Sequence, residues 1–541
     1  MQTHRGAVIS NNGMVASGHP LASWAGADIL SKGGNAMDAA IATASVSNVV
    51  LPHLCGLGGD AFILYYDADK NKVTEFNGSG VAPYGAHRDW FIERGYKKMP
   101  LDGILSVSVP GQVSALCSAG QFANYPLLEL LSHAITYAEK GFPISKRASD
   151  MIFKNAARLR KNKDSKKIFF KNGKPLKAGD ILIQKDLAKT FRKIGERGKD
   201  TFYKGEIFEK IMRFSNRQGG LFEGGEWTNH ETEMHEPLIS TYKGHKIIET
   251  SPPSQGYLVL EGLNILEKFN IQDSLSAEAI HYMVEIKRRI FSNRLKYLGE
   301  PFDKKLIDVL ISKNHAEIES KKINLNEISK HDIARSMPAF FEDTTYFSVV
   351  DKKGNAVSWI HSLSEDFGCG VIPEGTGVLL NNRAGRGFNL IENHPNVIAS
   401  GKKTMHTLNC WMVFKNNALK WVGGTPGGDG QPQWNMQLLS HLIDKGMNPQ
   451  QSVEAPRWLH FPGTDPETIN QPFSLYMEDK FEKSTIQKLE KKGQPVKLIK
   501  NWYEENLGGH GGNAQIIEIN QTNGSLIGGS DFREDGTTIG I

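Results

Sequence analysis

The alternation of apolar and polar residues predicts strands near both ends of the chain. Residues 61–66, AFILYY, form a short apolar run that we interpret as a buried strand, and residues 73–76 return as its hairpin partner. A second hairpin is expected where residues 344–351 alternate, turn at Lys-Lys-Gly-Asn and run back through residues 356–359. Further short strands are expected at 376–381, 408–414 and 419–422.

Helical signals occupy much of the remaining chain. Residues 35–50, rich in Ala and Ser and apolar on most sides, predict a helix buried between other layers. Apolar residues at helical spacing predict further helices at 127–140, 183–193, 275–298 and 436–445. Because the chain has no repeats, no low-complexity segment and no long linker, one interleaved α/β domain is favoured over two separate ones.

Composition narrows the class of protein. Of the 541 residues 39% are hydrophobic and 23% charged, which is typical of a soluble globular protein, and no apolar run reaches the ~18 residues of a membrane span. The net charge of +5, from 64 basic and 59 acidic residues, is too small to indicate nucleic-acid binding. The start, MQTHRG, lacks a secretory apolar run, which favours a cytoplasmic protein, although removal of a leader would leave the same sequence.

The dispersed cysteines and histidines give no sign of a metal or cofactor. Four cysteines without C-x-x-C spacing are interpreted as reduced core thiols, and His53 and His406 as satisfied structural residues. The loop 230–236 lacks H-E-x-x-H spacing, so we expect a solvated loop and no metal site. The glycine turns 56–60 and 423–430 complete no phosphate-binding motif, and each contains an aspartate that would repel phosphate.

Two features could carry acyl-transfer chemistry. A threonine hydroxyl is a weak nucleophile unless a base lies beside it, and an N-terminal threonine has its own α-amine, which titrates near pH 8. Thr344 is internal, so the chain would first have to cut itself, and an ordinary strand start is the simpler interpretation. Gly427 and Gly428 follow a proline and could direct two N–H groups at an oxyanion, or could simply form a tight turn. There is no G-x-S-x-G elbow that would offer a serine nucleophile instead.

The segment TTYFSVVD at 344–351, followed by GNAVS at 354–358, resembles the signature of the γ-glutamyltransferase family. Members are N-terminal-nucleophile hydrolases that cleave themselves before the first Thr of a Thr-Thr-(His/Tyr)-x-Ser motif. Seven further segments occur in the family's order: GGNAMDAA at 33–40, GLGG at 56–59, VPG at 109–111, PPS at 252–254, LLNN at 379–382, GTPGG at 424–428 and APR at 455–457. The resemblance therefore spans most of the chain.

This resemblance implies a four-layer αββα sandwich built by two fragments, residues 1–343 and 344–541, that stay associated in one domain after cleavage between Asp343 and Thr344. It implies Thr344 as nucleophile, its new α-amine as general base, Ser362 as the hydroxyl that holds this amine or the nucleophile, and an oxyanion hole at Gly427 and Gly428. It also implies that Arg88 pairs the carboxylate of a small amide substrate, as a guanidinium can with two parallel hydrogen bonds. No cofactor is implied, and the oligomeric state stays open.

Several positions depart from the family pattern. Where a typical transferase has acidic residues that hold the α-ammonium of glutamate, this chain has Arg383 and Arg386, which predicts a pocket that prefers anions. Ser364 replaces an Asn, and His406 and Thr407 replace a Ser-Ser pair that binds the substrate carboxylate.

Three functional hypotheses follow from the resemblance and these departures. The first is hydrolysis or transfer of γ-glutamyl amides such as glutathione, or of a related carboxylate-bearing amide. The second follows the branch with oxamate amidohydrolases and acylases, whose segments resemble GTPGGDGQ at 424–431 and the aspartate after GLGG. Its substrate would be a small anionic amide without an α-amino group. The third is a binding protein that keeps the fold without catalysis, which loss of Thr344 or of the Gly427–Gly428 pair would favour; all three residues are present.

Overall fold

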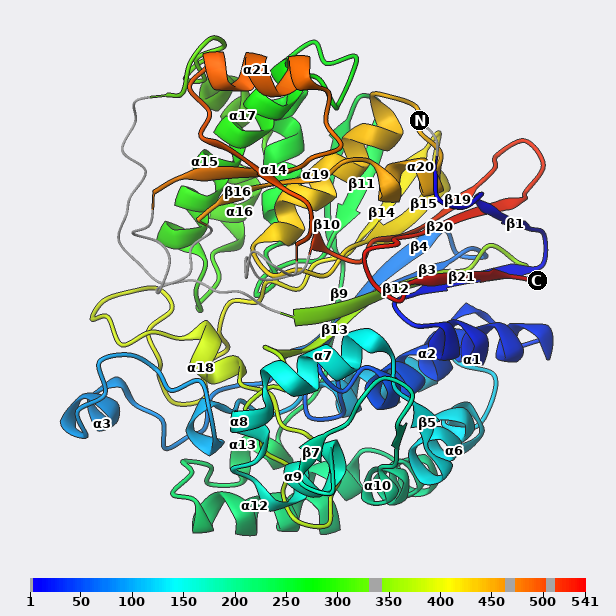
Figure 1. The fold of residues 1–541 in the computed structure, drawn as a ribbon, viewed down its shortest axis with the longest axis vertical. Helices are drawn as coiled ribbons and strands as arrows, with labels where there is room; N and C mark the ends of the chain where they lie inside the picture. Colours follow the sequence, from blue (N-terminus) through cyan, green and yellow to red (C-terminus); the bar gives the residue numbers. More distant parts are fainter. Residues whose placement is uncertain (1–2, 330–342, 463–471, 503–510) are drawn as a thin grey trace.

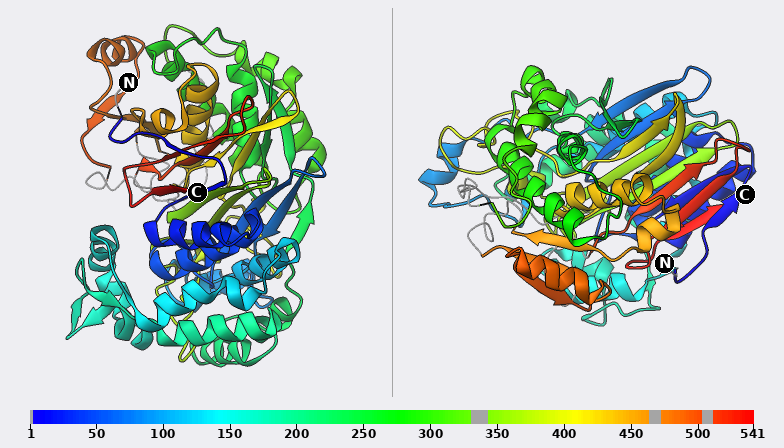
Figure 2. Two further views of the ribbon diagram at one scale, coloured as in Figure 1. Left: turned by 90° about the vertical axis from the view of Figure 1, so that its right-hand side faces the viewer. Right: turned by 90° about the horizontal axis from the view of Figure 1, so that it is seen from above.

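Two seven-stranded antiparallel sheets lie face to face, and helices cover the outer face of each (Figure 1). This computed structural model describes residues 3–329, 343–462, 472–502 and 511–541. The order of layers is helices, sheet, sheet, helices, which a turned view also shows (Figure 2). The expected four-layer αββα architecture is confirmed.

The lower sheet in Figure 1, here called the β12 sheet, has Thr344 in β12, an inner strand next to the central strand β13. Its strands lie in the order β21 (Thr537–Gly540), β2 (Gly13–Ser17), β12 (Asp343–Asp351), β13 (Ala356–Ser364), β3 (Asp60–Asp67), β4 (Lys72–Gly78) and β9 (Glu233–His235). The hairpin β12–β13 is longer than the alternation indicated.

The upper sheet, here called the β15 sheet, packs on the β12 sheet. Its strands lie in the order β1 (Val8–Ser10), β20 (Leu526–Ser530), β19 (Gln515–Ile519), β15 (Ala418–Gly424), β14 (Trp411–Lys415), β11 (His245–Glu249) and β10 (Leu238–Tyr242). Smaller sheets combine β16 (Trp458–Phe461), β17 (Ser474–Glu478) and β18 (Val496–Ile499); β5 (Phe142–Pro143) and β8 (Ile181–Leu182); and β6 (Phe170–Lys171) and β7 (Lys174–Pro175).

Helices from the first half of the chain lie below the β12 sheet. Those in or near contact with it are α1 (Pro20–Ser31), α2 (Ala36–Val50), α4 (Gln112–Ala119), α5 (Leu127–Leu130), α6 (Ser132–Lys140) and α10 (Lys185–Arg197). Further elements complete this region: α3 (Arg88–Glu93), η1 (Ile104–Ser106), η2 (Gly120–Phe122), α7 (Lys146–Lys154), α8 (Ala156–Leu159), α9 (Lys163–Phe169), α11 (Asp200–Tyr203), α12 (Glu206–Arg217) and α13 (Gly225–Thr228).

The layer above the β15 sheet combines segments from the middle and the end of the chain. It contains α14 (Gly256–Leu266), α15 (Ala277–Tyr297), α16 (Lys304–Leu310), α17 (Lys313–Ser320), α19 (Gly430–Ile443), α20 (Pro449–Glu454) and α21 (Lys483–Lys491). The five-residue helix α18 (Arg383–Gly387) lies in the loop region that follows β13.

Helix α2 shows why the small-residue segment is helical. The Asn35 side chain caps the helix by accepting from the N–H groups of Met37 and Asp38, while the Asp38 carboxylate accepts from the Asn35 N–H. All fifteen helical residues are buried, because α2 lies between the β12 sheet and other helices. A Cβ on Gly26 of α1 would lie 2.3 Å from Thr43 Oγ1, so the Ala- and Ser-rich composition permits close helix packing.

The space between the sheets is an apolar core to which both sheets contribute alternate residues. In β12, Tyr346 and Val350 face this core, whereas Phe347 and Val349 face the helices below. The Tyr346 hydroxyl lies 2.7 Å from Ser358 Oγ, which in turn donates to the Trp411 carbonyl of the β15 sheet at 3.3 Å. Even-numbered positions of β12 therefore face the opposite sheet.

The sequence-based element boundaries need several corrections. Residues 376–381 form no strand in the structure. Their one β-bridge joins Leu380 to Gly58, and the backbone at Gly375 and Gly377 has positive φ angles that interrupt an extended conformation. The strand expected at 408 begins at Trp411, and the helix expected at 436 already begins at Gly430. The helix expected over 127–140 is divided into α5 and α6.

One expectation for individual side chains was wrong, and two were right. The segment 230–236 is largely exposed, as expected, although His230 itself is buried and burial lowers its pKa to about 3. His406 is buried, yet neither ring nitrogen has a hydrogen-bond partner among the described residues, so it is not a satisfied structural histidine. The four cysteines are free thiols, three of them buried, as expected.

Candidate active site

Thr344 lies at the start of the inner strand β12, on the face directed at the β15 sheet. It is 2% exposed, and it shares the even-numbered face of β12 with Tyr346. Its Oγ1 atom is buried without a hydrogen-bond partner among the described residues. A nucleophile candidate therefore occupies one end of the space between the sheets, with its hydroxyl available.

The neighbouring strands bring Ser362 and Asp60 to the same end. Residues Asp60–Phe62 of β3 pair with Ile360–Ser362 of β13 in regular antiparallel register, with Ser362 opposite Asp60. Because Ile360 and Phe62 face the inter-sheet core, Ser362 and Asp60 face it too. Thr344, Ser362 and Asp60 thus lie on three adjacent strands, in the order in which the strands pair.

The hairpin is irregular where these residues lie. Asp343 pairs with Ser364 and Thr345 with His361, so β13 has one more residue than β12 in this interval. Ser364 has φ +88°, a left-handed conformation that non-glycine residues rarely adopt, and its N–H donates to Ser362 Oγ at 2.8 Å. The strained backbone directs two hydroxyls into the site region, and the Ser364 Oγ has no partner within the described ranges.

Gly427 and Gly428 form the turn between β15 and α19. Their φ angles of +127° and +51° favour glycine, and a Cβ on Gly427 would lie 2.1 Å from the Trp434 ring. Their carbonyls accept from the N–H groups of Gly430 and Gln431, whereas their own N–H groups donate in none of the backbone hydrogen bonds of the described residues. Two N–H groups on a rigid turn are suited to stabilising an oxyanion.

A buried polar network holds this turn. Arg294 of α15, 1% exposed, donates to the Gln255 side chain and, at 2.6 Å, to Asp429 Oδ1 directly after the glycine pair. Gln255 Nε2 donates to the carbonyls of Gly428 and Thr407, at 3.1 and 2.6 Å. The brace therefore links the glycine turn to the His406–Thr407 segment, and sequence reasoning missed both Arg294 and Gln255.

His406 and Thr407 approach the β12 sheet from the other side of the inter-sheet space. The His406 ring lies edge-on to Phe62 of β3, with ring centroids 5.2 Å apart, and its Nε2 lies 3.8 Å from Asp60 Oδ2. Burial and the nearby cations Arg383 and Lys403 hold the pKa of His406 well below its usual value, so its imidazole is neutral.

Each of the two arginines of α18 faces a carboxylate from elsewhere in the chain. Arg383 is fully buried with its Nε 3.7 Å from Asp60 Oδ2, and Arg386 Nη1 lies 3.3 Å from Glu365 Oε1. Acidic partners therefore lie beside both arginines although the segment 383–388 contains none, and the preference of the pocket for anions stays a prediction. Asp60 and Glu365 are distant from them in sequence, so no local pattern could have shown these pairs.

Arg88 lies at the start of α3, at the outer side of this region. Its Nε donates to the Leu390 carbonyl at 3.0 Å, and its guanidinium lies 2.8 Å from Asp89 and 3.8 Å from Glu392. The side chain is 30% exposed. A substrate-binding role for Arg88 stays a prediction, and it would require the guanidinium to bind a substrate carboxylate beside two carboxylates of the protein.

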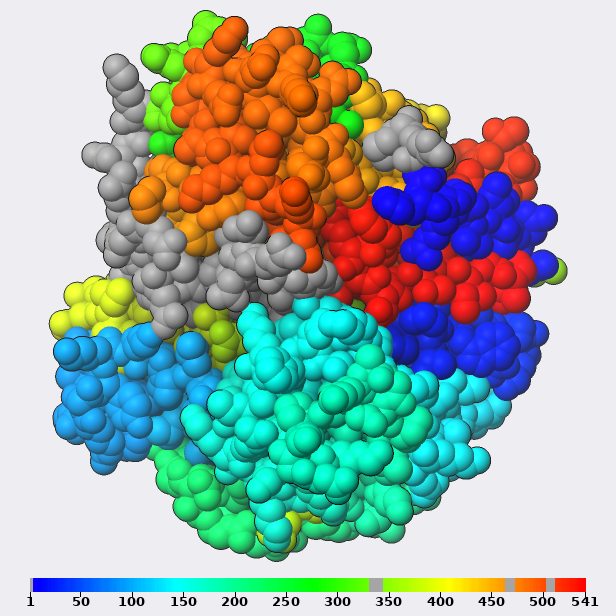
Figure 3. Space-filling view, viewed as in Figure 1, coloured from blue at the N-terminus to red at the C-terminus, as the bar shows by residue number. Residues whose placement is uncertain are grey.

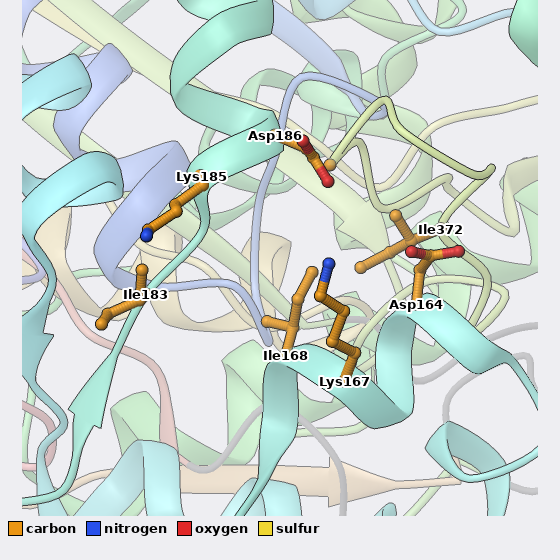
Figure 4. A pocket seen from close by; sticks show the side chains of 8 residues that line it. Asp164, Lys167, Ile168, Ile183, Lys185, Asp186 and Ile372 are labelled. Atoms are coloured by element: carbon orange, nitrogen blue, oxygen red, sulfur yellow. The ribbon is translucent and has the colours of Figure 1, made fainter.

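One cavity lies among the helices below the β12 sheet. Its walls combine two lysines and two aspartates with aliphatic side chains from α9, the start of α10 and the loop at 372–377 (Figure 4): Asp164, Lys167, Ile168, Ile183, Lys185, Asp186, Ile372 and Gly377. The opposite charges balance, and none of the candidate site residues lines this cavity. It offers no obvious part of an acyl-transfer site.

The described ranges contain no group of three or more His, Cys, Asp or Glu side chains arranged to hold a metal ion. Among the helices of these same ranges, none combines the length and apolar character that a membrane span requires.

A family model described as Gamma-glutamyltranspeptidase matches residues 22–541 of this chain. The glutathione hydrolase-like YwrD proenzyme of Bacillus subtilis (strain 168) is 36% identical over 540 residues, which cover 99% of each protein. The oxamate amidohydrolase proenzyme of Klebsiella pneumoniae is 29% identical over 98% of this chain and 99% of that protein.

The fold is also similar to solved structures. The cephalosporin acylase from Bacillus halodurans superposes with a TM-score of 0.90 at 32% identity, covering 100% of this chain and 98% of the acylase. Both the relatives and this structural neighbour are therefore similar to the chain over nearly its whole length.

Proposed function

The chain belongs to the gamma-glutamyltranspeptidase family, an enzyme family, and from this premise we propose that it is a self-processing amide hydrolase or acyltransferase with Thr344 as its nucleophile. The observation that carries the proposal is the buried, unpartnered Thr344 hydroxyl at the end of the inter-sheet space. The word proenzyme in the names of the relatives supports self-processing.

Maturation would convert Thr344 into a chain end. Its hydroxyl attacks the Asp343 carbonyl, the C–N bond breaks as the nitrogen takes up a proton, and water then hydrolyses the resulting ester. The products are a carboxylate on Asp343 and a free α-amine on Thr344. Such an amine titrates near pH 8, so it can act as general base for the same residue's hydroxyl.

In turnover, the Thr344 hydroxyl attacks the amide carbonyl of the substrate and releases its amine, leaving an acyl-enzyme. The N–H groups of Gly427 and Gly428 would stabilise the oxyanion, and the Ser362 hydroxyl would hold the new α-amine or the nucleophile. Water, or an acceptor amine, then resolves the acyl-enzyme. The rigid, glycine-specific turn supports this assignment.

We propose γ-glutamyl amides such as glutathione, or a related carboxylate-bearing amide, as the substrate class. The name of the YwrD relative supports this class, whereas the oxamate amidohydrolase and the cephalosporin acylase support the alternative, a small amide that lacks an α-amino group. The residues proposed to contact the acyl part are Arg88, Ser364, Arg383, Arg386, His406 and Thr407.

The proposed fragments, residues 1–343 and 344–541, would remain one molecule. The segment before Thr344 supplies β2, β3, β4 and β9 to the β12 sheet, and the later segment supplies the rest of β12, β13 and β21. The β15 sheet is mixed in the same way. The hydrogen bonds between paired strands would therefore hold the two fragments together, and no separate contact surface between them is needed.

Denaturing electrophoresis and intact mass measurement test the nucleophile. We expect wild-type protein to yield fragments 1–343 and 344–541, Thr344→Ala to stay one chain, and the control Thr345→Ser to be cut normally. Wild-type protein that hydrolyses amides as an intact chain would disprove the proposal, and so would cleavage of Thr344→Ala at the same bond.

A further inference from the structure

Asp60, the aspartate after the GLGG segment, is a buried acidic residue to which the proposed mechanism gives no role. It begins β3, is 0% exposed and lies opposite Ser362 on the site's side of the β12 sheet. Its Oδ1 accepts long hydrogen bonds from the N–H groups of Gly80 and Gly111, each at 3.3 Å. As the first residue of β3, Asp60 comes directly after the glycine turn.

The other oxygen, Oδ2, is directed into the site. It has no hydrogen-bond partner within the described residues, although Arg383 Nε and His406 Nε2 lie 3.7 and 3.8 Å away. A buried polar atom without a partner is unfavourable, so native interiors contain few of them.

Several unpartnered buried atoms lie in this part of the molecule, although others occur elsewhere in the described ranges. Besides Asp60 Oδ2 they include the hydroxyl oxygens and ring nitrogens of Thr344, Ser364, His406 and Thr407. These residues come from β3, β12, the end of β13 and the loop before β14. Such atoms are expected where a bound molecule supplies the missing partners.

The charges around Oδ2 indicate what kind of group fits. Arg383 lies close to Asp60, so a carboxyl group and a guanidinium lie side by side, and Lys403 is a further cation that acts on Asp60. A substrate that bears only a carboxylate would place it beside Asp60 as well as Arg383. A substrate with an ammonium next to a carboxylate would meet an opposite charge at each group.

We propose that Asp60 is a specificity-determining residue whose Oδ2 accepts a hydrogen bond from an ammonium group on the acyl part of the substrate, while the adjacent Arg383 faces that substrate's carboxylate. The inference rests on the proposed amide hydrolysis at Thr344 and narrows its substrate class to acyl groups with an α-amino acid head. Asp60 then supplies the negative charge that the segment 383–388 lacks.

Two anilides that differ only in the α-amino group test this role: a γ-glutamyl anilide and the corresponding glutaryl anilide. We expect Asp60→Asn to lower kcat/KM for the γ-glutamyl anilide about 10-fold to 100-fold, chiefly through KM, as for a lost charge-assisted hydrogen bond. For the glutaryl anilide we expect no loss, or a gain. An equal loss for both anilides, or no loss for either, would overturn the inference.

The matched control is Glu75→Gln. Glu75 is also a fully buried carboxylate of the β12 sheet, but it accepts from the N–H and hydroxyl of Ser251. We expect this variant to treat the two anilides as the wild type does. A change of preference as large as that of Asp60→Asn would show that any buried carboxylate has this effect, and would also overturn the inference.

Failure of the inference can be told from failure of the proposed function. Wild-type protein that is cut at Thr344 but prefers the glutaryl anilide refutes the role of Asp60 and leaves the hydrolase intact. Wild-type protein that stays one chain and turns over neither anilide refutes both.

A measurement on wild-type protein covers the case in which Asp60→Asn does not fold. We expect free glutamate to inhibit wild-type turnover at a lower concentration than glutarate does. The reverse order contradicts the proposal.

Discussion

At the scale of single residues, the site depends on atoms that the fold leaves without partners. Thr344, Ser364, Asp60 and His406 are all buried, and each has a polar atom that no described residue hydrogen-bonds. These arrangements are unfavourable for folding alone, since the polar atoms lose water without gaining a partner. Residues that reduce stability without structural benefit are expected where binding or catalysis needs them.

The titration of Asp60 should be visible in the pH dependence of stability. Burial raises the pKa of Asp60 to about 7, although Arg383 and Lys403 lower it. Because the folded state retains a proton that the unfolded state loses near pH 4, the free energy of unfolding falls as pH rises from about 4 to about 7. Asn does not titrate, so Asp60→Asn should abolish this decrease, which between pH 5 and pH 8 is about 2–3 kcal/mol.

Thermal unfolding at pH 5 and pH 8 measures this effect. We expect the Tm of the wild type to fall more between these pH values than the Tm of Asp60→Asn. The exposed Asp150→Asn serves as the control and should behave like the wild type. Identical pH profiles for Asp60→Asn and the wild type would rule out a raised pKa.

Gly427 should not tolerate a side chain. In Gly427→Ala the Cβ would lie 2.1 Å from Trp434 Cζ3, and φ of +127° is unfavourable for alanine. We expect a loss of about 2–4 kcal/mol in stability together with a lower kcat, because the turn must move.

The control for this change is Gly446→Ala, which has φ +66° but no atom within 4 Å of the added Cβ. Only backbone strain, about 1–2 kcal/mol, should result there, with kcat unchanged. Denaturant unfolding and steady-state kinetics distinguish the two variants. Equal effects on kcat would mean that the Gly427 turn has no special part in catalysis.

At the scale of elements, pattern and structure agree where a segment's partners are close in sequence. Helix α2 and the hairpins β3–β4 and β12–β13 follow from local periodicity and turn residues, and all are confirmed. Residues 376–381 look like a strand because they are apolar, but the positive φ at Gly377 and the hydrogen bonds of the Asn381 side chain to Gly58 and Ser108 hold them outside the sheets. Local propensity cannot predict such a tertiary constraint.

The candidate site could be predicted from the sequence to a similar extent. The family motifs propose Thr344, Ser362 and the glycine pair as candidates, because each lies within a distinctive local sequence. The pairs Arg383–Asp60 and Arg386–Glu365 join distant segments, and the sequence of 383–388 alone suggested an unbalanced positive charge. The departures from the family pattern suggested substrate contacts for these arginines, whereas the carboxylates beside them could be identified only from the three-dimensional structure.

The brace between α15 and the glycine turn should matter for catalysis. Asp429→Asn would leave Arg294 buried with a weaker partner, at a cost of roughly 3–5 kcal/mol, and would loosen the residue next to Gly428. We expect a lower Tm and a kcat that falls more than KM rises, since the oxyanion donors lose their position. The exposed pair Lys146–Asp150 offers the control, because Lys146→Ala should change neither quantity. Unchanged kcat in a folded Asp429→Asn protein would exclude the brace from catalysis.

At the scale of the whole molecule, each sheet is built from both ends of the chain. Strand β1 pairs with β20, and β2 lies between β12 and β21. Figure 3 shows the N-terminal segment in blue against the C-terminal strands in red on one face. Cleavage before Thr344 would therefore cut between the first two residues of β12 while leaving both sheets hydrogen-bonded.

The fragments should consequently be inseparable without denaturant. We expect cleaved protein to elute from a sizing column as one species containing both fragments, and to separate only when the sheets unfold. Mass measurement of the eluted peak checks this result. Recovery of folded fragment 1–343 alone under native conditions would contradict the interleaved arrangement.

The pairing of β2 with β21 also sets the time at which the chain can mature. During synthesis β2 waits for a partner that is translated much later, since Gly13–Ser17 pair with Thr537–Gly540. The β12 sheet is complete only after Thr537–Gly540 have left the ribosome. A nascent chain halted before residue 537 should therefore remain uncut, and the appearance of the Thr344 terminus would report that β21 has been translated and has joined the sheet.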